Sequence, residues 1–163
     1  MKELYTPLCY IESSRLVMGG IDLDPASSFE ANSRIKAKRI FSEFDDGLAH
    51  KWYGRVFLHP PQDLDKVFCN KALSEYKSGR VAKVIILVRC QYYLPWQEAL
   101  FSYPLCLVHH KIPYLLENGK IYKSTAYQDM FVYLGKDIPV FEAEFRKYGY
   151  IMAHLSQSTH STP

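Results

Sequence analysis

One largely apolar run, residues 81–89, constrains the fold more than any other feature of the sequence. A continuous run of this kind favours a strand covered on both faces, which is typical of parallel sheets. A shorter β-branched and aromatic run, residues 55–58, precedes it and stops at two prolines, which cannot donate to a sheet. Residues 63–77 lie between the two runs and have apolar positions at helical spacing. This order of strand, helix and strand predicts a parallel crossover unit.

Turn and capping residues divide the rest of the chain into further elements. The other predicted helices cover residues 7–18, closed by two glycines, then 28–39, 95–101 and 139–148. The other predicted strands cover residues 21–24, 39–42, 105–109, 112–116 and 129–134. Strands that alternate with helices predict an α/β domain with a largely parallel central sheet and helices on both faces.

The length of 163 residues and the 48% hydrophobic content suit one domain with a sizeable core. We expect that domain to cover residues 1–155. The remaining segment, residues 156–163, is rich in serine and threonine, and we expect it to be disordered.

Charge, cysteine usage and apolar run length argue against several classes of protein. The net charge of +3 permits nucleic-acid binding but is smaller than that of a dedicated binder. The four cysteines form no CxxC pair and no signal-peptide pattern precedes them, so we expect reduced thiols in a cytoplasmic protein. No apolar run approaches the ~20 residues of a membrane helix, so we expect a soluble protein. His109 and His110 are adjacent and lack partners at ligand spacing, so we expect no metal site.

Acidic or proline-containing segments follow three of the predicted strands. They are Asp22 with Asp24, Asp45 with Asp46, and residues 59–62. Ligands of open α/β sheets bind beyond the carboxyl ends of the strands, so these segments could converge on one cleft. Each of these segments alone also has a structural explanation, because such residues are common in turns and at the ends of strands.

Four segments together carry a resemblance to a known family. They are Tyr5-Thr6-Pro7 and the blocks IDLDPASSFEANSRIKAKRIF, DDGLAHKWYGRVFLHPP and MFVYLGKDIPVFEAEFRKYGYI. In these segments the chain resembles the phage-type, Dam-like DNA N6-adenine methyltransferases, and the resemblance covers residues 4–152. It implies a Rossmann-like methyltransferase fold, S-adenosylmethionine as cofactor and double-stranded DNA as partner. The implied reaction is methylation of the exocyclic amine of adenine.

The resemblance also implies which residues bind the cofactor. Thr6 and Pro7 correspond to the N-terminal cofactor segment, and the loop under the methionine part corresponds to Asp22, Asp24, Pro25, Ala26 and Ser27. The loop beside the cofactor adenine corresponds to Asp46, Gly47 and Leu48. Carboxylates suit a ligand that carries an ammonium and a sulfonium group.

The implied catalytic motif departs from the family pattern. The family has Asn or Asp followed by Pro-Pro-Tyr, whereas this chain has His59, Pro60, Pro61 and Gln62. The family's Asn or Asp oxygen and first proline carbonyl accept the two amine hydrogens, and its aromatic residue stacks on the flipped base, a contact worth about 1–3 kcal/mol. A neutral His59 can offer one ring nitrogen, but Gln62 has only a small π face. Another aromatic residue would then have to stack on the base, and the nearby candidates are Tyr92, Tyr93 and Trp96.

Two functions from different classes follow from these residues. The first is an adenine-N6 methyltransferase of DNA in which the altered motif is either tolerated or lowers the rate, and the second is a catalytically inactive relative that binds DNA, cofactor or a partner. Methylation of another planar amine, such as cytosine N4 or a protein glutamine, is a third alternative. Candidate DNA contacts are the basic residues within 34–39, which equally suit a solvated helix face, and the stretch 104–127, with His109, His110, Lys111, Lys120 and Lys123.

Overall fold

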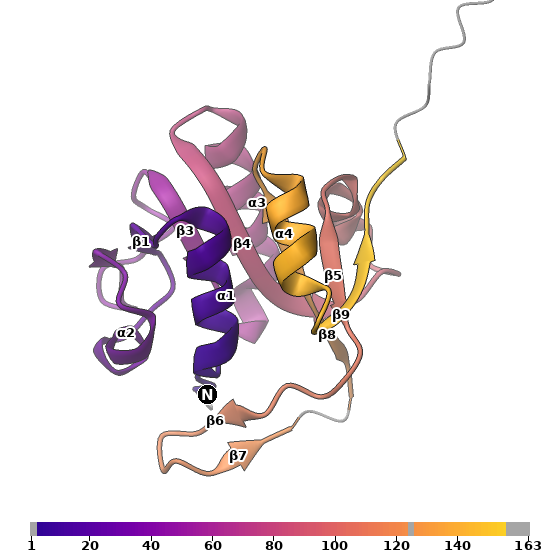
Figure 1. Ribbon diagram of the computed structural model, residues 1–163. Coiled ribbons are helices and arrows are strands. Elements are labelled where there is room, and N and C mark those ends of the chain that lie inside the picture. The colour runs from indigo at the N-terminus through magenta and orange to yellow at the C-terminus, as the bar shows by residue number, and fades with distance from the viewer. Residues whose placement is uncertain (1–2, 124–125, 156–163) are drawn as a thin grey trace, which may run out of the picture.

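A seven-stranded sheet forms the middle layer of the computed structural model, which describes residues 3–123 and 126–155 (Figure 1). In spatial order its strands are β2 (Arg39–Ile40), β1 (Leu23–Asp24), β3 (Gly54–Leu58), β4 (Val81–Cys90), β8 (Gln128–Leu134), β5 (Leu105–Val108) and β9 (Gly149–Met152). The first four strands are parallel to one another, and every later pairing is antiparallel. The α/β class is therefore confirmed, but the sheet is mixed, and the expected parallel arrangement holds for one half only.

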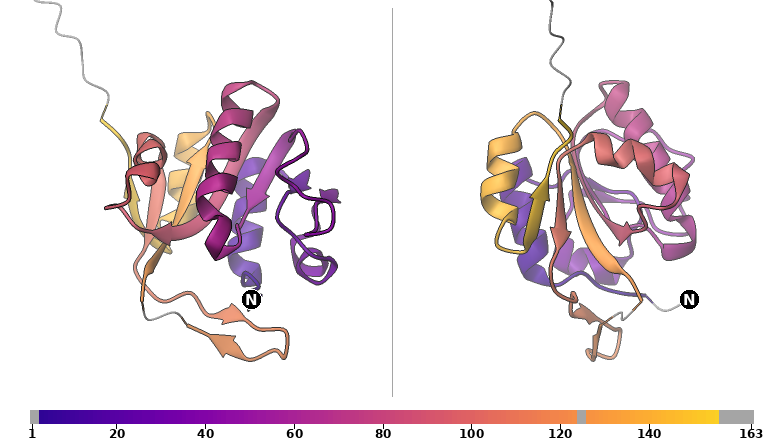
Figure 2. Two further views of the ribbon diagram at one scale, coloured as in Figure 1. Left: turned by 180° about the vertical axis from the view of Figure 1, so that it is seen from behind. Right: turned by 90° about the vertical axis from the view of Figure 1, so that its right-hand side faces the viewer.

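Helices cover both faces of the sheet (Figure 2). One face packs against α1 (Leu8–Met18), α4 (Ile138–Phe145) and the end of α2 (Phe29–Ile35). The other face packs against α3 (Asp65–Lys77), which follows the 3₁₀ turn η1 (Gln62–Leu64), and against the 3₁₀ segment η2 (Pro95–Ser102). The result is a three-layer α/β domain.

Strand β4 supplies side chains to both cores. Successive residues of a strand point to opposite faces, so Ile85 and Leu87 pack with α1 and α4. Val84, Ile86 and Val88 pack with α3 instead. All five side chains are buried, as the continuous apolar run predicts.

Two predicted helices differ from the observed ones in a way that matters for function. The predicted basic helix through residue 39 is wrong in its second half, because α2 ends at Ile35 and Lys36 takes a left-handed conformation with φ of 51°. Lys38 and Arg39 therefore lie outside a helix. The predicted helix over residues 7–18 begins one residue later, at Leu8, because Pro7 is the N-cap of α1, and no side chain caps it.

A small second sheet stands apart from the large one. Its strands are β6 (Tyr114–Leu115) and β7 (Ile121–Tyr122). Sequence patterning predicts β6 but neither β7 nor β9, because these short strands lack a periodic apolar run. The predicted disordered tail at 156–163 lies outside the described residues.

All four cysteines are free thiols. Within residues 3–123 and 126–155, no helix has the length and apolar character needed to cross a bilayer. The same residues contain no cluster of three or more His, Cys, Asp or Glu side chains that could hold a metal ion.

Candidate functional site

A cleft of about 710 Å³ lies beyond the carboxyl ends of β1 and β3. Its walls come from the N-terminal segment, the start of α2 and the loops that follow β1, β2 and β3. The predicted site residues that line it are Thr6, Asp24, Pro25, Ala26, Ser27, Asp46, Gly47, Leu48, His59, Pro60, Pro61 and Gln62. The three strand-end segments thus meet in one cavity, whose volume is in the range usual for small-molecule sites.

Asp24 is the buried acid of this cleft. It ends β1 with only 2% of its surface exposed, and its Oδ1 accepts a hydrogen bond of 3.1 Å from the backbone nitrogen of Ala26. Burial raises the pKa of its carboxyl to about 7, against the opposing effect of the Ala26 and Ser27 hydrogen bonds. A carboxyl poised in this way favours a cationic ligand, because a nearby positive charge stabilises the ionised form.

The loop at Asp46 and Gly47 is held directly against the loop after β1. A Cβ atom on Gly47 would lie 2.0 Å from the carbonyl oxygen of Pro25, so only glycine permits this approach. The indole nitrogen of the buried Trp52 donates a hydrogen bond of 2.8 Å to the Gly47 carbonyl. Asp46 accepts from the backbone nitrogen of Leu48 at 3.2 Å. These contacts set the distance between two walls of the cleft.

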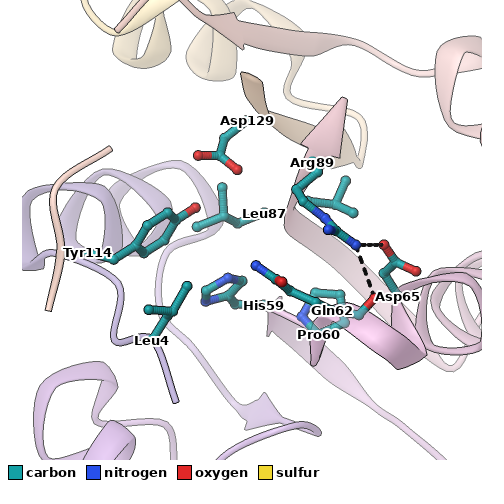
Figure 3. A pocket seen from close by; sticks show the side chains of 10 residues that line it. Leu4, His59, Pro60, Gln62, Asp65, Leu87, Arg89, Tyr114 and Asp129 are labelled. Atoms are coloured by element: carbon teal, nitrogen blue, oxygen red, sulfur yellow. Dashed lines mark hydrogen bonds and ion pairs between the residues drawn. The ribbon is translucent and has the colours of Figure 1, made fainter. Parts of the chain in front are cut away.

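His59 is held on two sides at the floor of the cleft. Its Nδ1 lies 3.1 Å from the hydroxyl of Thr6, and its ring stacks on Tyr114 with centroids 5.4 Å apart and planes 17° from parallel (Figure 3). Loss of hydration lowers the pKa of the imidazole to about 4. His59 is therefore neutral at neutral pH and can offer one donor and one acceptor nitrogen. The Thr6 side chain serves this contact and not the cap of α1.

A second, small cavity lies behind the same loop (Figure 3). Its volume of about 20 Å³ has room for one water molecule, and its lining includes His59, Gln62, Tyr114 and Asp129. Burial raises the pKa of Asp129 to about 6. Arg89, which lines this second cavity, donates a hydrogen bond of 3.2 Å to the Gln62 carbonyl and so also holds the loop after β3.

The aromatic residues expected to stack on a base do not line the cleft. Tyr92, Tyr93 and Trp96 follow β4 and lie outside both cavities. Two phenylalanines that sequence reasoning missed lie on the wall instead, Phe29 with 87% and Phe44 with 92% of its surface exposed. The sequence signal for Phe44 is an apolar ring in a polar turn, and for Phe29 it is an apolar ring at the first position of a helix. Exposed rings of this kind can stack on a planar ligand.

Asp22 and Pro7 are the two predicted cofactor residues that do not line the cleft. The Asp22 carboxylate is occupied by Arg55, which donates to it from Nε at 2.7 Å, from Nη2 at 2.9 Å and from its backbone nitrogen at 2.9 Å. Lys38 lies 3.2 Å from the same carboxylate. Asp22 therefore joins β1 to β3 and does not face a ligand.

Replacing Asp22 with asparagine is expected to lower the free energy of unfolding at pH 7 by about 1.5–3 kcal/mol, the usual contribution of charged hydrogen bonds. The Arg55 hydrogen bonds hold the pKa of Asp22 well below its usual value. The stabilisation is therefore present above the usual pKa and is lost as the pH falls through and below that value. Urea titrations at pH 7 and pH 3 should show the difference from wild type shrinking at pH 3. The exposed Asp63→Asn serves as control, and an equal loss in both variants would contradict this role for Asp22.

The sequence matches no protein-family model, and no curated protein matches it significantly.

Proposed function

We propose that this protein is an S-adenosylmethionine-dependent DNA adenine-N6 methyltransferase with a Rossmann-like methyltransferase fold. The observation that carries the proposal is that the loops after β1, β2 and β3 line one cleft. These are the loops that the family resemblance assigns to the methionine part, the adenine part and the target base. Their place beyond the ends of parallel strands agrees with the general rule for ligand sites in α/β sheets.

The residues on the cofactor side fit the proposed ligand. Asp24 offers a buried carboxylate to the ammonium group of the methionine part. Asp46 offers an acceptor and the backbone nitrogen of Gly47 offers an amide group to the adenine ring, while the Leu48 amide donates to Asp46 and holds this loop. The bound cofactor would supply an electrophilic methyl group on its sulfonium.

The target amine would be held by the loop after β3. The Pro60 carbonyl accepts one amine hydrogen, and a ring nitrogen of the neutral His59 accepts the other. This role requires the Thr6 hydroxyl to accept a hydrogen bond from Nδ1, which leaves Nε2 as the acceptor. Orienting both hydrogens directs the nitrogen lone pair toward the methyl group.

A catalytically inactive binding protein is the second candidate function. The observation that favours it is the restraint of His59 by Thr6 and Tyr114, because an imidazole held in this way is longer and differently placed than a carboxamide. A misplacement of about 1 Å can cost ~100-fold in rate. The departure at His59 and Gln62 from the family motif changes no residue of the loops after β1 and β2, which form the cofactor side of the cleft.

Two measurements test the proposal. Calorimetric titration with S-adenosylmethionine should show one binding site, and transfer of a tritiated methyl group to unmethylated duplex DNA should be detectable. Binding with transfer supports the enzyme, and binding without transfer supports the inactive relative. Absence of cofactor binding would overturn the enzyme and would favour a binding protein that does not use the cofactor.

Substituting Gly47 with alanine is expected to weaken cofactor binding at least 10-fold. The new methyl group would collide with the Pro25 carbonyl and push the two loops apart. The matched control is Gly79→Ala, which has a φ of +84° but no atom within 4 Å of the added Cβ. That variant should lose about 1–2 kcal/mol of stability from its left-handed backbone and keep its affinity. Calorimetry on both variants checks the prediction, and equal affinities would refute the role of Gly47.

A further inference from the structure

The β6–β7 hairpin projects from the body of the protein near the N-terminus and the start of α1 (Figure 1, Figure 2). Its strands pair Tyr114 with Tyr122 and Leu115 with Ile121. The turn is closed by a hydrogen bond of 2.9 Å from Leu116 to the carbonyl of Lys120. Residues 117–121 at the tip are all exposed.

The base of the hairpin is fixed to the functional cleft by three contacts. Leu115 exchanges two backbone hydrogen bonds with Tyr5, of 2.8 and 3.0 Å. The buried ring of Tyr114 stacks on His59, and Tyr122 lines the cleft itself. The tip is thus held at a defined position relative to the loop that would receive a target base.

The chemistry of the hairpin suits duplex DNA. A two-stranded β-ribbon fits the major groove, and enzymes that act on a base must draw it out of a duplex lying across the cleft. Lys120 and Lys123 are exposed, and the only acid in residues 112–123 is Glu117. Ile121 adds an exposed apolar side chain between the two lysines.

We propose that the β6–β7 hairpin enters the major groove of duplex DNA, with Lys120 and Lys123 binding backbone phosphates. This inference depends on the proposed function for the class of partner and deepens it by naming the element that holds the duplex. The hairpin then sets which base reaches the loop after β3.

The test compares two double variants with equal loss of charge. Lys120→Gln with Lys123→Gln removes the hairpin lysines, and Lys77→Gln with Lys136→Gln removes two exposed lysines at the end of α3 and after β8. Binding of a fluorescently labelled duplex of about 20 base pairs is followed by anisotropy as the salt concentration rises. Each phosphate contact contributes about −0.9 to the slope of log K against log salt.

The hairpin variant should lose about 2 from the magnitude of the slope and bind at least 10-fold more weakly at low salt. The control variant should keep the wild-type slope. Equal slopes in all three proteins, or no duplex binding by wild type at low salt, would overturn the inference. Cofactor calorimetry on the same proteins separates the two proposals, because a wild type that binds DNA through the hairpin but no cofactor defeats only the proposed function. Thermal unfolding confirms that both variants fold.

Discussion

Replacing Asp24 with asparagine should reduce cofactor affinity at least 100-fold and at the same time stabilise the protein at pH 8. The carboxamide keeps the shape of the side chain and its hydrogen bond from Ala26, but it cannot pair with an ammonium group. Affinity is lost because a charged partner is missing. Calorimetry with S-adenosylmethionine checks this part of the prediction.

The stabilisation follows from the raised pKa of Asp24. Its carboxyl titrates near pH 7 in the folded protein and near 3.8 when unfolded. Between these values the folded state binds more protons, so stability falls as the pH rises from 4 to 7, and the whole cost is present at pH 8. An asparagine at this position does not ionise, so the variant avoids this loss in the free energy of unfolding, which is up to about 4 kcal/mol. Urea titrations should show the variant's advantage growing between pH 4 and pH 8, and a variant that is less stable at pH 8 would contradict it.

Restoring the family pattern with His59→Asn and Gln62→Tyr is expected to raise methyl transfer at least 100-fold. Asparagine offers an oxygen acceptor of the expected length, and the exposed position of Gln62 leaves room for a ring that stacks on the base. Stacking alone is worth about 1–3 kcal/mol, or roughly 5- to 150-fold. Tritiated-methyl transfer to unmethylated duplex DNA measures the gain.

Each single substitution is the control for the double variant. The two groups act on the same flipped base, so their effects should exceed the sum of the single effects. Cofactor affinity is measured on each variant, because His59 also contacts Thr6, which the resemblance assigns to the cofactor segment. A double variant that binds cofactor normally and transfers no more methyl groups than wild type would refute the assignment of the target site to this loop.

The parts of the fold that sequence patterning predicts well are those with long local signals. The apolar run at residues 81–89 extends over nine residues, and the helical spacing of α3 extends over 13. The antiparallel half of the sheet was not predicted, because strand direction depends on contacts between distant segments such as β4 and β8. The early end of α2 depends on one left-handed residue, Lys36, which no simple rule marks.

For the candidate site too, local sequence patterns predict some features, whereas others depend on contacts between distant residues. Sequence patterning places acids and prolines at strand ends, and the general rule for α/β sheets predicts that they converge. It cannot distinguish Asp24, which faces the cleft, from Asp22, which binds Arg55, because the two residues are only two positions apart. The contact of Thr6 with His59 spans 53 positions and is equally invisible to local patterns.

The alternating side chains of β4 have a consequence for how the domain melts. Since one strand belongs to both hydrophobic cores, neither core can open without exposing the other, and heating should give a single cooperative transition. Amide hydrogens of β4 should be the slowest in the molecule to exchange with deuterium. The adjacent strand β3, which carries the His-Pro-Pro-Gln loop, is therefore supported by the part of the domain that opens last.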